Sequence, residues 1–132
     1  MKINIEVIPH YEQRYPTVGD YWKDPDGTLQ VRISKLSDWR FMALIIIHEL
    51  WEYFRVKRDK IPLKTIDDFD MDYEKNRPKC DHSEPGDFPT CPYRDAHCAA
   101  SGVERILASE LGVVWLDYEL EIMGLNDPKI KY

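Results

Sequence analysis

The sequence has no excess of basic residues, few cysteines and no long apolar run. Its 132 residues include 18 Lys and Arg against 24 Asp and Glu, which gives a formal net charge of −6. The chain therefore lacks the positive surface that binding to nucleic-acid phosphates requires. The longest apolar run, Phe41 to Ile47, is too short to span a membrane. Nucleic acids and membranes are thus excluded as expected partners.

Three cysteines, Cys80, Cys91 and Cys98, are an odd number and a poor basis for a disulfide framework. The first residues, Met1 to Glu6, have no apolar stretch of the kind found in signal peptides. We therefore expect an intracellular, cytoplasmic protein with reduced thiols. The chain also has no glycine-rich phosphate loop and no G-x-S-x-G motif.

What the sequence does contain is enough apolar material for one folded domain. Apolar residues make up 43% of the chain and aromatic residues 12%, which excludes disorder as the ground state. We predict a single α+β domain over residues 1–132. Its predicted parts are a β-sheet region (1–36), a helix (37–61), an irregular loop (62–92) and a helical region (93–123).

The β-sheet region is predicted from alternating apolar and polar residues. Lys2–Ile8 alternates and reads as a half-buried strand, with Ile3, Ile5 and Val7 on its buried side. Val18–Lys23 and Thr28–Lys35 flank a turn-forming Asp24-Pro25-Asp26-Gly27 segment. We expect these two to form a hairpin, and the first strand to complete a small antiparallel sheet.

Two helices are predicted to pack with this sheet. A long central helix from Asp38 to Asp59 begins at the N-cap signal Ser37-Asp38 and is apolar on nearly all sides in its first half. A second helix runs from Tyr93 or Arg94 to Leu111, and a shorter helical segment follows over Val113–Met123. The tail Gly124–Tyr132 is expected to be irregular.

The predicted loop between the helices contains an acidic run from Asp67 to Glu74. Phe69, Met71 and Tyr73 alternate with acidic residues there, which suggests an extended segment. Its expected roles are solvation or attraction of a basic partner.

The segment His48-Glu49-Leu50-Trp51-Glu52 carries the clearest chemical signal. His48 and Glu52 are four residues apart and so project from the same helical face. A carboxylate brought to the protein interior needs a cation or good hydrogen-bond donors. In the H-E-x-x-H motif two such positions bind zinc, and the intervening Glu acts as the general base. Here Glu52 replaces the second His, and carboxylate is also a zinc ligand.

A third ligand is expected from the second helix. His97, Ala100, Glu104, Leu107 and Leu111 form a core-facing stripe at helical spacing. His97 would therefore complete a site with His48 and Glu52, and Glu49 would be the catalytic base. Glu104 would be a fourth ligand or would accept a hydrogen bond from a ligating His. Fe(II) or Mn(II) would also suit two His and one carboxylate.

Two other interpretations of these residues remain open. The first is a buried His–Glu hydrogen-bonded network without metal that links the two helices. The second is a structural zinc site formed by Cys80, His82, Cys91 and either His97 or Cys98, whose spacing lacks the paired C-x-x-C pattern.

Together, several motifs resemble small phage or prophage proteins of uncharacterised function that have a zincin-like metal-site pattern. The motifs are His48-Glu49-Leu50-x-Glu52, Glu84-Pro85-Gly86-Asp87, Pro92-Tyr93, His97-x-x-Ala100-x-x-x-Glu104, Leu111-Gly112 and Trp115. The resemblance covers roughly residues 40 to 118 and implies a phage-borne metalloprotein with a zincin-like core, located in the host cytoplasm. The sequence departs from ordinary zincins at Glu52, which stands where they have the second His.

The leading function hypothesis is a small zinc-dependent hydrolase, peptidase-like, acting on a protein or peptide substrate. The alternative is a non-enzymatic interaction protein encoded by a phage, such as a host modulator. In that case His48, Glu52 and His97 would be structural, and the acidic segment Asp67–Glu74 would contact a basic partner.

Overall fold

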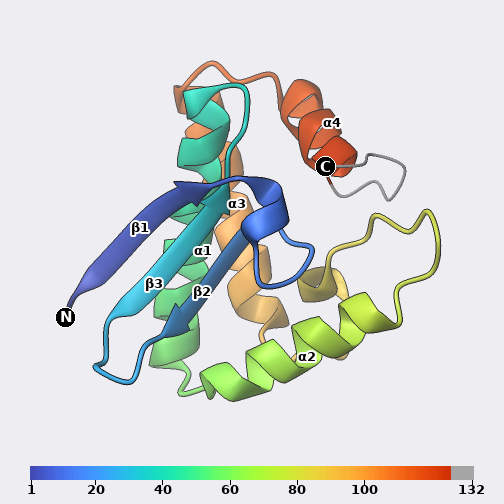
Figure 1. Cartoon of the computed structure of the whole chain (residues 1–132). Coiled ribbons are helices and arrows are strands. Elements are labelled where there is room, and N and C mark those ends of the chain that lie inside the picture. Colours follow the sequence, from blue (N-terminus) through green and yellow to red (C-terminus); the bar gives the residue numbers. More distant parts are fainter. Residues whose placement is uncertain (126–132) are drawn as a thin grey trace.

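The computed structural model describes residues 1–125 and confirms an α+β fold (Figure 1). A three-stranded sheet is combined with four α-helices and two short 3-10 helices. The elements are β1 (Ile3–Ile8), η1 (His10–Glu12), β2 (Gly19–Lys23), β3 (Leu29–Ser34), α1 (Trp39–Arg58), α2 (Leu63–Lys75), η2 (Pro85–Asp87), α3 (Arg94–Glu110) and α4 (Trp115–Leu125). In the predicted irregular tail, Gly124 and Leu125 belong to α4, and the remainder lies outside the described residues.

The sheet is mixed rather than fully antiparallel. The predicted hairpin is confirmed, since β2 and β3 pair antiparallel and Gly27 takes a positive φ of 86° in the connecting turn. The strand order is β1-β3-β2, and β1 pairs parallel to β3. The prediction that β1 is antiparallel was wrong. Strand β2 lies at the edge of the sheet away from β1, and its hairpin partner β3 returns between them. The neighbour of β1 is therefore β3, which runs in the same direction as β1.

One face of the sheet is covered by α1, which contacts β2 and β3. The side chains of Leu29, Val31 and Ile33 are fully buried there. By contrast, the side chains of Ile3, Ile5 and Val7 on β1 are exposed, and only Ile8 at the end of the strand is buried. The prediction of a half-buried first strand was therefore wrong, because β1 is an edge strand and α1 contacts the two other strands.

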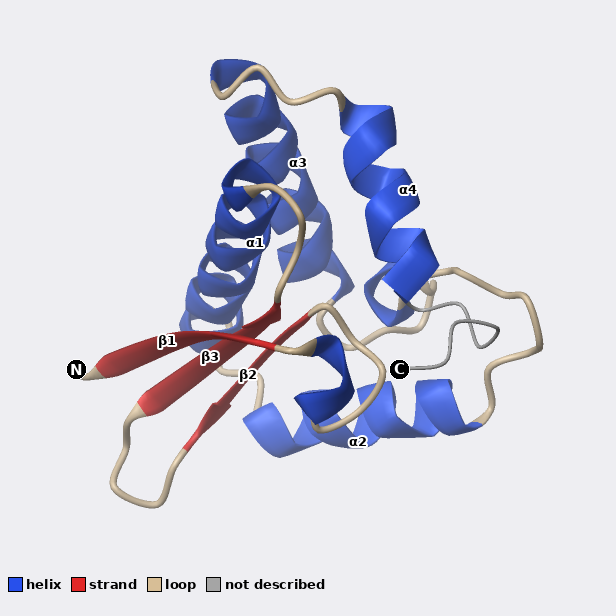
Figure 2. Ribbon diagram, turned by 45° about the horizontal axis from the view of Figure 1, so that its top comes forward, coloured by secondary structure: helices blue, strands red, loops and turns tan. Residues whose placement is uncertain are grey.

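The two long helices α1 and α3 lie side by side on the same face of the sheet (Figure 2). The predicted central helix is confirmed over Trp39–Arg58, and the Asp38 side chain caps it by accepting a hydrogen bond from the Arg40 backbone N–H at 2.9 Å. On α3, Ala96, Ala100 and Ala108 are buried. Such small side chains let the two helix backbones approach closely.

The predicted loop over residues 62–92 contains a helix, α2, which runs from Leu63 to Lys75. Leu63, Ile66, Phe69 and Tyr73 are spaced by three or four residues, and Ile66 is buried while Met71 is exposed. The alternation of Phe69, Met71 and Tyr73 was therefore misleading, because the helical spacing is the one that reaches the core. Irregular chain follows from Asn76, interrupted only by η2.

The apolar core forms two clusters along α1, one on each side of His48 and Glu52. One cluster includes Tyr53 and Val56, towards the C-terminal end of the helix. The other includes Phe41, Leu44 and Ile45, towards its N-terminal end. Polar groups thus interrupt the core at the middle of its longest helix. Within residues 1–125, no helix has the length and apolar character needed to cross a membrane.

Candidate metal centre

The structure brings His48 and Glu52 of α1 together with His97 of α3. The Glu52 Oε2 atom lies 3.3 Å from His48 Nε2 and 3.2 Å from His97 Nδ1. One candidate ligand atom from each of the three residues lies within 4.8 Å of the others, and all three residues are buried. The convergence follows from the i, i+4 spacing on α1 and from the core-facing position of His97 on α3.

The donor set and its spacing fit a zinc ion. Ligands about 2.1 Å from a tetrahedral zinc ion lie about 3.4 Å from one another. Two of the three ligand-to-ligand distances are already 3.2 and 3.3 Å. Two imidazoles and one carboxylate are also a common ligand set for catalytic zinc, with a fourth position left for water or substrate.

Each of these three candidate ligand residues has a further polar neighbour. Glu104 Oε1 lies 2.7 Å from His48 Nδ1, and the Tyr21 hydroxyl donates to Glu52 Oε1 at 2.8 Å. His97 Nε2 lies 2.9 Å from a Glu84 carboxylate oxygen and 3.3 Å from Asp87. These contacts leave His48 Nε2 and His97 Nδ1 directed at Glu52, as in metal sites whose ligating histidines are oriented by carboxylates.

Two glycines provide space for site side chains. A Cβ atom at Gly19 on β2 would lie 2.4 Å from Glu49 Oε1, and one at Gly86 would lie 2.2 Å from the His97 ring. The backbone can come this close only because glycine has no side chain. Gly19 therefore allows Glu49 its position beside β2, and Gly86 allows η2 to cover His97.

The charge state of the site is set by its buried contacts. Burial raises the pKa of Glu52, but the hydrogen bonds with His48 and His97 outweigh it and lower the pKa to about 2. Burial lowers the pKa of His97, but Glu52 and Glu84 outweigh it and raise the pKa to about 10. The pKa of His48 is likewise raised, against burial, by Glu104 and Glu52. Glu52 is thus ionised between two imidazoles.

Glu49 differs from Glu52 although both lie on α1. Burial, and then the negative charge of Glu52, raise the pKa of Glu49 well above its ordinary value. No cation holds Glu49 in its ionised form as tightly as the two histidines hold Glu52. A carboxyl group whose pKa is raised holds a proton more readily than an ordinary Glu, which is a property of carboxyl groups that transfer protons.

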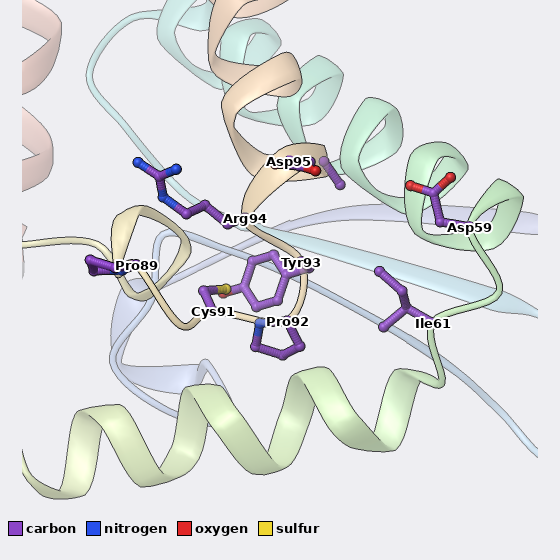
Figure 3. Close-up of a pocket in the computed structure, with 9 residues that line it drawn as sticks. Asp59, Ile61, Pro89, Cys91, Pro92, Tyr93, Arg94 and Asp95 are labelled. Atoms are coloured by element: carbon purple, nitrogen blue, oxygen red, sulfur yellow. The ribbon is translucent and has the colours of Figure 1, made fainter.

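The cluster opens onto a cavity of about 830 Å³. Its walls include His48, Glu49, Glu52 and His97, and β2 contributes Gly19 to Tyr21. A smaller hollow of about 250 Å³ lies between the end of α1 and the segment that leads into α3, where Asp59 and Ile61 face Cys91 to Asp95 (Figure 3). None of the three ligand residues lines the smaller hollow.

The alternative site of Cys80, His82, Cys91 and Cys98 is not brought together. Cys80 and Cys98 are exposed, whereas Cys91 is buried, and burial raises the pKa of the Cys91 thiol to about 12. Among residues 1–125, the groups of metal-binding side chains that converge are His48, Glu52 and His97, and Glu84, Asp87 and His97.

Sequence reasoning missed several residues around the site. Tyr21 and Gly19 were read only as part of a strand, although their alternation on β2 points both towards α1. Glu84 and Asp87 belong to a motif of the resemblance, but the sequence pattern does not place them beside His97. The short Glu-Pro-Gly-Asp segment was recognisable, but which helix it would cover depends on contacts distant in sequence.

Comparison with known protein families, with curated proteins and with solved structures gives no match. The resemblance to small phage proteins therefore stays a prediction, and the site is interpreted from its own geometry.

Asp70 on α2 forms a second buried acidic feature beside the cavity. It is 7% exposed, accepts a hydrogen bond from the Tyr15 hydroxyl at 3.1 Å and accepts another from the Tyr93 hydroxyl. Burial outweighs these hydrogen bonds and raises the pKa of Asp70 to about 7. At pH values between the pKa of Asp70 in the unfolded chain and its pKa in the native state, the native state binds the proton more tightly than the unfolded state. The stability that this provides is therefore lost as the pH rises towards 7.

We predict that Asp70→Asn removes this pH dependence. Relative to the wild type, the variant should gain about 2 kcal/mol in free energy of unfolding between about pH 5 and about pH 8. Urea denaturation at both pH values measures the difference. The exposed Asp68→Asn variant on the same helix is the matched control and should show no such gain. Parallel profiles for the wild type and Asp70→Asn would contradict this account.

Proposed function

We propose that this protein is a zinc-dependent hydrolase of zincin-like type that acts on peptide bonds. His48, Glu52 and His97 hold the ion, and Glu49 is the general base. The observation that carries the proposal is the approach of two imidazole nitrogens to a single buried carboxylate oxygen at 3.3 and 3.2 Å. The further nitrogen of each ring faces another carboxylate.

A bound zinc ion would supply a Lewis acid that polarises a carbonyl group and acidifies a water molecule. The chain's own residues have separate roles. Glu104 and Glu84 orient the two histidines, and Tyr21 orients Glu52. Glu49 takes up a proton from the attacking water and then delivers it to the leaving amine. Its raised pKa, and the space that Gly19 leaves for it, suit that role.

The cavity supports a peptide as the substrate class. Its volume of about 830 Å³ is large enough for several residues of a chain, and the edge strand β2 borders it. An extended peptide can hydrogen bond through its backbone to a strand at the edge of a sheet.

The hypothesis of an interaction protein that attracts a basic partner has less support. Its acidic segment is engaged within the chain: Asp67 pairs with Arg14, Asp68 with Lys64 and Glu74 with Arg77. Asp70 is buried against two tyrosines. Little of the segment's charge is therefore left for a partner.

A buried His–Glu network without metal is the closest rival, since the same side chains already hydrogen bond to one another. Zinc content separates the two. We predict about one equivalent of zinc in wild-type protein after incubation with zinc and dialysis, measured by elemental analysis. His48→Ala and His97→Ala should each lower the zinc affinity by about a hundredfold or more.

The matched control for these variants is His82→Ala. His82 is exposed and belongs to the alternative cysteine-containing site, so the control should keep the full equivalent of zinc. Less than about a tenth of an equivalent in the wild type would contradict the metal centre. Loss of zinc from His82→Ala alone would show that zinc binds at the alternative site with the cysteines.

We further predict that Glu49→Gln keeps zinc but loses hydrolysis by a factor of about a hundred or more, because the amide cannot accept the proton. A mixture of unstructured peptides, analysed by mass spectrometry after incubation, gives the readout. Glu110→Gln, at an exposed position on α3, is the control. Unchanged cleavage in Glu49→Gln would overturn the role of Glu49, and zinc-loaded wild-type protein that cleaves nothing would overturn the hydrolase.

A further inference from the structure

The edge strand β1 carries a row of uncovered apolar side chains. Ile3, Ile5 and Val7 are 38%, 42% and 47% exposed. Their partners on β3 are Leu29, Val31 and Ile33, which are fully buried beneath α1. Paired residues on neighbouring strands point to the same face. The apolar layer of the sheet therefore continues onto β1, where it is only partly covered within the described part of the chain.

The backbone of β1 is also open along its outer edge. Lys2 O accepts a hydrogen bond from Leu29 N at 2.9 Å, and Ile8 O accepts one from Lys35 N at 2.7 Å. The even-numbered residues of β1 therefore face β3, and the N–H and C=O groups of the odd-numbered residues point outwards. The strand pairs with β3 without a break in register and contains no proline. It therefore has no proline or break in register that would prevent edge-to-edge pairing, and the charged residues Lys2 and Glu6 decide which strand can pair with it.

The neighbouring helix adds to the same uncovered region. Ala43, Ile47, Leu50 and Phe54 of α1 are spaced by three or four residues and form a stripe on the side of the helix opposite His48 and Glu52. Phe54 is 44% exposed, and the other three are half-buried. Figure 2 shows α1 above the sheet, and the register with the buried side chains of β3 places the apolar β1 side chains on the same face. Partly exposed apolar groups of strand and helix thus lie on the same side of the sheet.

We propose that β1 pairs antiparallel with β1 of a second copy of this chain, about a two-fold axis at Asn4. In this register Ile3 lies opposite Ile5 of the second copy, and their free backbone groups exchange hydrogen bonds. Lys2 lies opposite Glu6 of the second copy on the polar face, so each end of the paired strands has one pair of oppositely charged side chains. The result is a continuous six-stranded sheet.

The symmetry of the segment favours a second copy over an unrelated strand. Lys2-Ile3-Asn4-Ile5-Glu6 has isoleucines placed symmetrically about Asn4 and opposite charges at its two ends. Antiparallel pairing with itself therefore matches apolar with apolar and positive with negative at the four positions that flank Asn4. The two-fold axis is perpendicular to the sheet and places both α1 helices on one face. Their apolar stripes then flank the β1 side chains and cover them.

Sedimentation of the full chain tests the dimer. Sedimentation should give the wild type twice the chain mass of 15.7 kDa. The Ile5→Lys variant should sediment as a monomer, and its circular dichroism spectrum should be unchanged. The control is Ile106→Lys, at a position on α3 that is 66% exposed, and it should stay dimeric. A monomeric wild type, or a dimer that Ile5→Lys leaves intact, would overturn the proposal.

A charge exchange tests the register without placing a charge in the apolar region. Lys2→Glu and Glu6→Lys each put like charges opposite one another, and each should raise the dimer dissociation constant by about tenfold. The double variant Lys2→Glu/Glu6→Lys restores opposite charges and should bring the constant back towards the wild-type value. Single variants without effect, or a double variant as weak as the singles, would overturn this register.

Discussion

A buried carboxylate between two imidazoles is the interaction on which the rest of this structure depends. Glu52 is 5% exposed, and a carboxylate removed from water to this extent is stable only with close positive charge or strong donors. His48 comes from the same helix, one turn earlier, and His97 must come from another helix. The contact between α1 and α3 is therefore required by charge as well as by apolar packing.

The surrounding fold is built to make that contact close and well oriented. Alanines on α3 allow the two helices to approach, and apolar clusters on either side of the polar groups hold them together. Glycines at two positions let β2 and η2 reach Glu49 and His97. Two neighbouring glutamates on α1 consequently have opposite pKa shifts. Glu52 is held ionised by the histidines, whereas Glu49, without such partners, takes protons more readily.

The parts of the fold that could be predicted were those with strong local patterns. The apolar run and the N-cap of α1, the turn of the hairpin and the core-facing stripe of α3 led to three residues that do converge, His48, Glu52 and His97. The direction of β1 could not be predicted because strand pairing is decided by contacts distant in sequence. Its exposure could not be predicted either, since alternation does not say whether a helix lies over the strand.

The segment around α2 shows a second limit of prediction from sequence patterns. Phe69 and Tyr73 fit both an alternating pattern with Met71 and a helical pattern with Ile66, and the burial of Ile66 and Asp70 against the rest of the chain decides between the two patterns. The contacts of Tyr21 with Glu52, and of Glu84 and Asp87 with His97, could not be predicted for a related reason. They are single side chains on a strand and a turn, and their importance comes from what α1 and α3 bring to them.

The central claim is that His48, Glu52 and His97 bind one metal ion. Anomalous diffraction at the zinc edge, from crystals grown with zinc, tests it most directly. The account predicts one strong peak about 2.0 to 2.2 Å from His48 Nε2, a Glu52 oxygen and His97 Nδ1. A peak at Cys80, Cys91 or His82, or a map with no peak and the three side chains still hydrogen bonded to one another, would contradict it.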